Sequence, residues 1–184
     1  ISLYNKNTDQ FINFTQDTAS CLLNFTFQAN DITADNKGNI WIASNVGLVK
    51  FNRTDNDYEV FTNDTSDPES ISNSFCTGLQ IDSYNRLWIS TQQGINLYNS
   101  DNRTFKTVSE GINGKDYSDL VYLKLAEDQS QNLWINSEDG LFRIKLTGDG
   151  DDKLQHFAPN PDDPNSISGN MLSGIYVDHE NNLW

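Results

Sequence analysis

A tryptophan preceded by an apolar residue recurs along this chain of 184 residues at a nearly constant interval. The four tryptophans are Trp41, Trp88, Trp134 and Trp184, separated by 47, 46 and 50 residues. An aspartate stands six residues before each of them, at Asp35, Asp82, Asp128 and Asp178. A glycine stands six residues after each of the first three, at Gly47, Gly94 and Gly140. A period of this length is typical of an architecture in which one small structural unit is copied along the chain.

Each copy is predicted to contain four short strands. In the second copy, apolar segments at 77–82, 87–91, 95–98 and 104–108 are separated by short stretches rich in Asn, Asp, Gly and Ser. These residue types favour tight turns, and helical spacing is not sustained anywhere in the chain. Four strands per repeat are typical of a β-propeller blade. We therefore expect an all-β protein, a β-propeller with about four blades of four antiparallel strands.

The phase of the repeat suggests that this chain is a fragment of a larger propeller. The predicted units are approximately 1–28, 29–75, 76–119, 120–171 and 172–184, and the first and last of them are incomplete. Incomplete units leave unpaired strand edges, which bind other strands readily. The expected partners are therefore the remaining blades of the propeller or a second copy of the chain, which would make a homodimer.

Within each blade we expect the tryptophans to pack between neighbouring blades, because the middle strands of a propeller are buried on both faces. The recurring aspartates are expected to accept backbone N–H bonds in the turns that follow them. Cys21 and Cys76 could pair or stay free, and Cys76 takes a core position in its repeat.

The charge balance excludes several classes of partner. The chain has 12 Lys and Arg against 26 Asp and Glu, a net charge of −14. Such a surface repels phosphate backbones and anionic lipids, so we expect no nucleic acid partner and no direct membrane contact. No apolar run is long enough to cross a bilayer, and no signal peptide is visible at the beginning of the chain.

No catalytic group, metal site or cofactor is expected. The two histidines, His156 and His179, lie in different units, His156 on a predicted outer strand and His179 in a turn. The recurring aspartates all obey the repeat, whereas a catalytic pair of carboxylates would have to depart from it and converge.

A ligand is expected on the face where second-to-third strand turns and the connectors between units open together. The residues of these segments differ from blade to blade, whereas a purely structural role would favour similar residues in every blade. Amides, carboxylates and an aromatic ring are suited to a ligand rich in hydroxyl groups. The candidate binding residues are Asn45, Gln92, Gln93, Asp116, Tyr117, Glu138 and Asp139.

The repeat resembles the two-component regulator propeller repeat. The resemblance rests on the pattern Asp-x-x-x-Asn-apolar-Trp-Ile-x-Ser/Thr-x-x-Gly and on the connectors Asp-Pro-Glu-Ser-Ile-Ser at 67–72 and Asp-Pro-Asn-Ser-Ile-Ser at 163–168. Arg86 departs from the pattern, because the other copies have Asn39, Asn132 and Asn182 at its position. The resemblance implies the periplasmic sensor region of a hybrid two-component system, in which seven-bladed propellers detect oligosaccharides and regulate a histidine kinase.

Two other functions remain open at this stage. Streptogramin lyases are propellers with similar repeats, and such an enzyme would need a histidine base and metal-binding acids over the central channel. The chain could also be a scaffold for protein–protein interaction or dimerisation. The sensor is the leading hypothesis, and it makes this chain non-catalytic.

Overall fold

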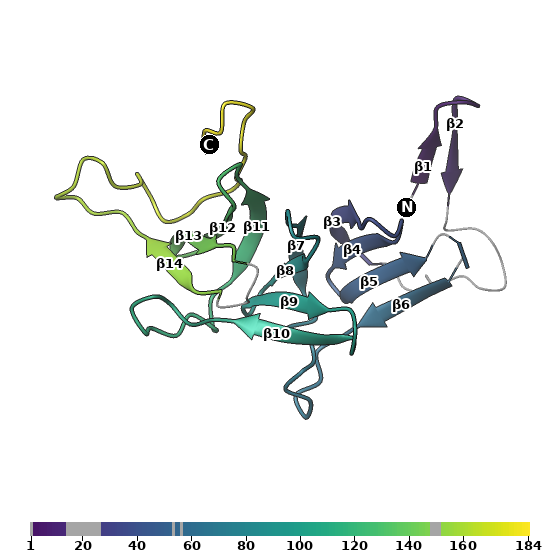
Figure 1. Cartoon of the computed structure of the whole chain (residues 1–184), viewed down its shortest axis with the longest axis horizontal. Helices are drawn as coiled ribbons and strands as arrows, with labels where there is room; N and C mark the ends of the chain where they lie inside the picture. The colour runs from purple at the N-terminus through teal and green to yellow at the C-terminus, as the bar shows by residue number, and fades with distance from the viewer. Residues whose placement is uncertain (1, 14–26, 53, 56, 148–151) are drawn as a thin grey trace.

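The computed structural model describes residues 2–13, 27–52, 54–55, 57–147 and 152–184, and its regular elements are all β-strands. Three four-stranded antiparallel sheets lie side by side, and a two-stranded hairpin stands apart from them (Figure 1). The hairpin consists of β1 (Ser2–Asn5) and β2 (Gln10–Asn13). The prediction of an all-β fold built from four-stranded antiparallel units is confirmed.

Each sheet is a blade whose strands follow one another in sequence order. The first blade contains β3 (Ala29–Ala34), β4 (Ile40–Ser44), β5 (Gly47–Asn52) and β6 (Asp57–Phe61). The second contains β7 (Cys76–Ile81), β8 (Leu87–Thr91), β9 (Ile95–Asn99) and β10 (Thr104–Val108). The third contains β11 (Tyr122–Glu127), β12 (Asn132–Ser137), β13 (Gly140–Lys145) and β14 (Leu154–Phe157).

The first strands of the three blades lie against one another, with β7 between β3 and β11. Lys124 of β11 reaches the first blade, where its Nζ lies 3.2 Å from a carboxylate oxygen of Asp31 and donates to the carbonyl of Asn30 at 2.8 Å. The register of each first strand shifts once near its beginning, between Ala29 and Asp31 in the first blade. These strands therefore form the inner edge of the propeller.

The core fills the two spaces between neighbouring blades. One cluster joins the first and second blades around Trp41, and the other joins the second and third blades around Trp88. Trp41 is 2% exposed and Trp88 is fully buried, which confirms the expected packing between blades for these two residues. Cys76 is buried in the cluster around Trp41, as expected for a core position, and its thiol is free; Cys21 lies outside the described residues. Burial raises the pKa of the Cys76 thiol to about 12.

The spacing of the repeat has a direct structural cause in the turn after each first strand. One carboxylate oxygen of Asp128 accepts the backbone N–H groups of Ser130 and Asn132 at 2.8 and 2.9 Å. Its other oxygen accepts the side-chain amide of Asn132 at 2.7 Å and the indole N–H of Trp134 at 2.8 Å. The prediction that the aspartates accept backbone N–H bonds is confirmed, and the additional bond to the tryptophan explains why the two residues stand six apart.

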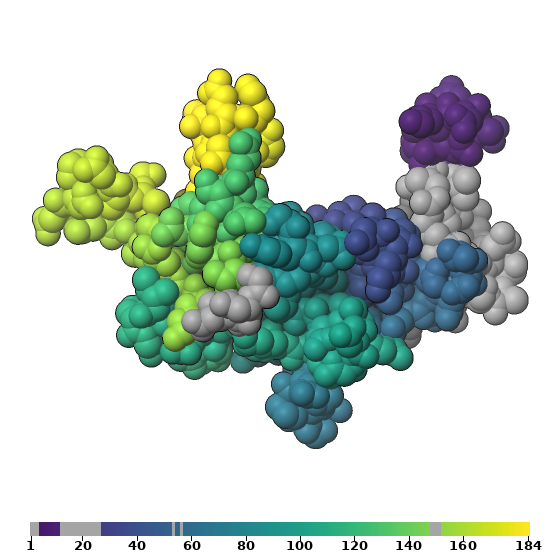
Figure 2. All heavy atoms as spheres, in the orientation of Figure 1, coloured from purple at the N-terminus to yellow at the C-terminus, as the bar shows by residue number. Residues whose placement is uncertain are grey.

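The same turn recurs in the other copies. Asp35, Asp82 and Asp178 accept the indole N–H of Trp41, Trp88 and Trp184 at 3.0, 2.8 and 2.7 Å. The last copy closes a short hairpin through a bridge between Val177 and Leu183, and its Trp184 is 75% exposed. In Figure 2 this C-terminal segment, in yellow, and the hairpin β1–β2, in purple, both stand out from the three blades.

Candidate functional site

The turns between second and third strands bring one group of predicted ligand residues to a common face, here called the loop face. The first residue of each turn donates its backbone N–H to the carbonyl that precedes the inner strand of its blade. These bonds run from Asn45 to Gln28, from Gln92 to Phe75 and from Glu138 to Val121, at 3.2, 3.1 and 3.2 Å. Asn45, Gln92 and Glu138 therefore occupy equivalent places beside the inner edge.

The side chains on these turns differ in how many of their polar groups are available to bind a ligand. Asn45 accepts the N–H of Gln28 at 2.8 Å through its side-chain oxygen, and Glu138 accepts the N–H of Val121 at 3.3 Å. Gln93 is exposed and donates from its amide to Asp119 at 3.4 Å, and Gln92 is exposed beside it. The second blade therefore presents the most accessible amides of the loop face.

In the connector between the second and third blades, one of the two predicted ligand residues is buried instead of exposed. Tyr117 is 3% exposed, and its ring packs edge-on against Phe142 at 5.0 Å, so it belongs to the core and presents no surface for stacking a sugar. Asp116 is exposed, and hydrogen bonds from the backbone N–H and hydroxyl of Ser118 lower the pKa of its carboxyl group. The connector buries the tyrosine because β14 and β13 supply an apolar pocket that local sequence does not reveal.

The two histidines are far from forming a common catalytic centre. His156 lies on β14, stacks on Phe142 with 4.4 Å between ring centroids, and places Nε2 2.5 Å from the carbonyl oxygen of Asp139. His179 lies in the turn after the third blade with its side chain 91% exposed. Both positions agree with the expected outer strand and turn. Within the described parts of the chain, no group of three or more His, Cys, Asp or Glu is arranged to hold a metal ion.

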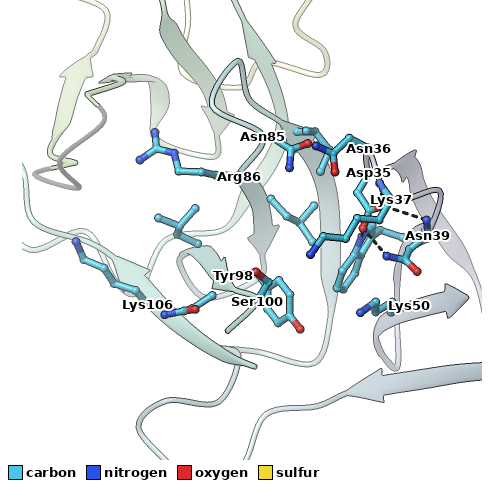
Figure 3. A pocket seen from close by; sticks show the side chains of 15 residues that line it. Asp35, Asn36, Lys37, Asn39, Lys50, Asn85, Arg86, Tyr98, Ser100 and Lys106 are labelled. Carbon is cyan, nitrogen blue, oxygen red and sulfur yellow. Dashed lines mark hydrogen bonds between the residues drawn. The ribbon is translucent and has the colours of Figure 1, made fainter. Parts of the chain in front are cut away.

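A cleft of about 360 Å³ opens between the first and second blades, at the opposite end of the strands from the loop face (Figure 3). Its walls come from the β3–β4, β7–β8 and β9–β10 turns and from β5, β9 and β10. The polar lining residues are Asp35, Asn36, Lys37, Asn39, Lys50, Asn85, Arg86, Asn99, Ser100 and Lys106. We refer to it as the inter-blade cleft.

None of the predicted site residues lines the inter-blade cleft. One sequence signal did point to this region, because Arg86 replaces the asparagine that the other copies have at the same place. The lysines of the cleft come from three different segments, and only the packing of two blades brings them together.

The fold is similar to solved propellers over most or all of its length. The extracellular domain of BT4673, assigned as a hybrid two-component system of B. thetaiotaomicron, matches with a TM-score of 0.74 at 19% identity, covering 100% of this chain and 23% of that one. The corresponding domain BT3049 matches with a TM-score of 0.72 at 22% identity, covering 96% of this chain and 23% of that one. The resemblance seen in the sequence is thus matched at the level of the fold, and this chain spans less than a quarter of those structures.

A second kind of propeller is also similar. Virginiamycin B lyase from Staphylococcus aureus matches with a TM-score of 0.63 at 19% identity, covering 88% of this chain and 49% of that one. No family model and no curated protein matches the chain. No helix able to cross a membrane is found among the described residues.

Proposed function

We propose that this chain is part of the extracellular sensor region of a hybrid two-component system and acts there as a non-catalytic propeller. It binds an oligosaccharide on the loop face and thereby regulates a histidine kinase elsewhere in a longer protein. This function places the chain in the periplasm. The observation that carries the proposal is the similarity in fold to two such extracellular domains, over 100% and 96% of this chain.

The chemistry of the described residues supports a binding role. The recurring aspartates, the most regular acidic residues of the chain, are occupied by hydrogen bonds that hold their own turns. The amides of Gln92 and Gln93 are exposed on the loop face, with carboxylates of Glu138 and Asp139 on the equivalent turn of the next blade. Such groups can donate to and accept from sugar hydroxyls.

Thermal unfolding in the presence of defined oligosaccharides tests the proposal. A ligand at about 100 times its Kd stabilises the folded state by roughly 2.7 kcal/mol, so one glycan class is expected to raise the Tm clearly. Replacing Gln92 and Gln93 by alanine should remove the shift. Asn102→Ala, an exposed amide in the β9–β10 turn at the other end of the strands, is the matched control and should retain it. A shift that survives the double substitution would contradict binding at this face.

A lyase-like enzyme is the second candidate, favoured by the similarity to virginiamycin B lyase. The histidines argue against it, because His156 is stacked in the wall of the third blade and His179 is exposed in a turn. Incubation with virginiamycin B is followed by liquid chromatography and tandem mass spectrometry, because ring opening by elimination gives an isomer of unchanged mass. The antibiotic is expected to elute and fragment unchanged. Ring opening that is lost in His156→Ala or His179→Ala would replace the sensor proposal with an enzyme.

The third possibility, a scaffold, shares with the sensor its need for partners. We propose that the remaining blades of a longer propeller, or a second copy of this chain, pack against its two ends. Side chains at these ends are markedly exposed for apolar residues, including Phe11 at 67% and Met171 at 92%. A scaffold without a ligand is expected to show association but no response to any glycan.

A further inference from the structure

The two spaces between neighbouring blades are built from equivalent residues, but only one of them holds the inter-blade cleft. Between the second and third blades, Arg86 donates from Nε to Asp82 at 2.7 Å and extends to Asp152, 3.5 Å from its carboxylate, and to the carbonyl of Thr147 at 3.3 Å. The guanidinium lies 5.3 Å from the centre of the Trp88 ring. The arginine thus covers the tryptophan and fills the space that would otherwise open there.

Between the first and second blades the same place is left open. Asn39 takes the position of Arg86, but its short side chain turns back and donates to Asp35 at 2.7 Å. The facing turn between β9 and β10 spans only residues 100–103, whereas the segment between β13 and β14 spans 146–153 and supplies two of the three partners of Arg86, Thr147 and Asp152. A shorter side chain and a shorter turn therefore leave a cleft above Trp41.

The cleft concentrates positive charge in a strongly acidic chain. Lys37, Lys50 and Lys106 all line it, a quarter of the 12 basic residues, in a chain of net charge −14. Among the described residues, no carboxylate lies within 4.0 Å of the amino groups of Lys37 or Lys50. Figure 3 shows these two side chains reaching toward Tyr98, whereas Arg86 points away from them. The one carboxylate of the lining, Asp35, already accepts four hydrogen bonds.

The floor of the cleft is aromatic and its rim is polar. Trp41 and Tyr98 pack edge-on with 5.0 Å between ring centroids, and the amine of Lys50 lies 5.3 Å from the centre of the Trp41 ring. Exposed asparagine and serine side chains surround them at Asn85, Asn99 and Ser100. A volume of about 360 Å³ lies at the lower end of the range for small-molecule sites, about 300–1,000 Å³. Trp41 is 2% exposed and Tyr98 8% exposed, so these rings close the bottom of the cleft without offering a face for stacking. The amines, amides and hydroxyls above them are suited to a small anion that also carries hydroxyl groups.

We propose that the inter-blade cleft is a second binding site, which takes a sugar-sized ligand bearing a carboxylate or sulfate group. Lys37 and Lys50 bind the anionic group, and the amides and hydroxyl of the rim bind the ligand's hydroxyls. The inference goes beyond the proposed function, because the cleft lies at the opposite end of the strands from the loop face and its ligand does not depend on what that face binds.

The indole N–H of each tryptophan provides a local probe in a two-dimensional NMR spectrum of the ¹⁵N-labelled 184-residue chain. D-glucuronate and glucose 6-sulfate are titrated separately to distinguish carboxylate from sulfate, with glucose and inorganic sulfate as the neutral and plain-anion controls. At least one of the two charged sugars is expected to shift the Trp41 signal saturably and to leave the Trp88 signal in place, because Arg86 closes the space above Trp88. Equal shifts at both indoles, no saturable shift with either sugar, or an equal response to inorganic sulfate would overturn the proposal.

Four substitutions, one of them a control, separate a built site from general charge attraction. Lys37→Gln and Lys50→Gln are each expected to weaken binding about tenfold through loss of a charge-assisted hydrogen bond, whereas Lys6→Gln, in the exposed β1–β2 turn, should leave it unchanged. Lys37→Glu reverses the charge of an amine that the proposal places on the anionic group, and should abolish the Trp41 response. Unshifted Trp88 and Trp134 signals report that each variant is folded. A Trp41 response that is unchanged in Lys37→Glu would show that the cleft is not the site.

Discussion

The aspartate that opens each turn is the residue on which the repeat depends. Its two carboxylate oxygens receive four N–H groups, two from the backbone of the turn and two from the side chains four and six residues later. Burial alone would raise the pKa of Asp128, but hydrogen bonds from Asn132, Trp134 and Ser130 outweigh it and hold that pKa below its ordinary value of 3.8. The pKa of Asp35 is lowered in the same way.

These lowered pKa values make the fold sensitive to acid. A carboxyl group whose pKa is lower in the folded state stabilises the protein above its unfolded pKa of about 3.8 and loses that contribution as the pH falls through the folded value. Asp128→Asn removes one titrating group, so its free energy of unfolding should fall less between pH 5 and pH 3 than that of the unchanged chain. At pH 7 the variant should be less stable by about 1–3 kcal/mol, because an amide N–H₂ then faces two N–H donors. Urea unfolding at both pH values measures this, and an identical acid dependence in both proteins would contradict it.

Arg86 is the residue whose departure from the repeat has the largest expected effect on stability. Its partners Asp82 and Asp152 have fully buried side chains, and its own side chain is 19% exposed. Arg86→Met should lower the free energy of unfolding by about 3–5 kcal/mol, because it leaves buried carboxylates without their guanidinium. Arg103, 64% exposed in its ion pair with Glu59, is the matched control, and Arg103→Met should cost no more than about 1 kcal/mol. Equal losses in urea unfolding would refute a special role for Arg86.

At the scale of the element, the close approach of the inner strands depends on one glycine. A Cβ atom on Gly78 of β7 would lie 2.5 Å from the carbonyl oxygen of Leu123 and 2.8 Å from the hydroxyl of Ser90. That hydroxyl donates to the same carbonyl at 2.7 Å, and Thr77 donates to the carbonyl of Tyr122 at 2.5 Å. Side-chain hydroxyls of the second blade thus bind backbone carbonyls of the third, and they can do so only because β7 lacks a side chain at this point.

Gly78→Ala is therefore expected to push the second and third blades apart and to destabilise the fold by about 1–3 kcal/mol. Gly169→Ala is the control, because a Cβ there would meet no atom within 4 Å, and its free energy of unfolding should change by less than about 1 kcal/mol. The urea concentrations at which half of each variant is unfolded measure the difference. An unaltered midpoint in Gly78→Ala would mean that the blades do not approach as closely as described.

At the scale of the whole molecule, the burial of the tryptophans depends on the presence of a neighbouring blade. Trp88 has blades on both sides and is fully buried, Trp134 is half-buried against Phe157 of its own blade, and Trp184 is 75% exposed. The bond from indole to aspartate is present in all of them, so the turn forms whether or not the ring is covered. Packing between blades is thus separate from the local structure of each unit.

The exposed apolar side chains at the two ends predict that this chain associates with itself. Met171→Ser, at a residue that is 92% exposed, should weaken the association without affecting folding. Ile112→Ser, at a residue 64% exposed in the β10–β11 connector, is the control and should have little effect. Sedimentation velocity over a range of concentrations measures both. A chain that remains monomeric at every concentration would remove the second copy from its expected partners.

Much of the architecture could be predicted from the sequence because it is local and repeated. The distances between Asp128, Trp134 and Gly140 are set within one turn and one hairpin, and the same spacing in several copies makes the pattern visible. The position of the loop face could also be predicted, because successive turns of antiparallel strands alternate between the two ends of a sheet. The burial of Tyr117 did not follow, because its pocket is formed by residues of another blade.

The amino-acid sequence by itself therefore determined the four-stranded unit, its period and the hydrogen-bonding role of the aspartates. Each turn is held by residues at most six positions apart, each strand pairs with the next one along the chain, and the pattern is repeated in several copies. Only the tertiary structure decided which space between blades is open. Asn39 and Arg86 occupy the same position in their repeats, yet the space above Trp88 is closed because the segment between β13 and β14 supplies partners for the arginine. The shape of the space between two blades depends on side chains from both blades, which are distant from one another in the sequence.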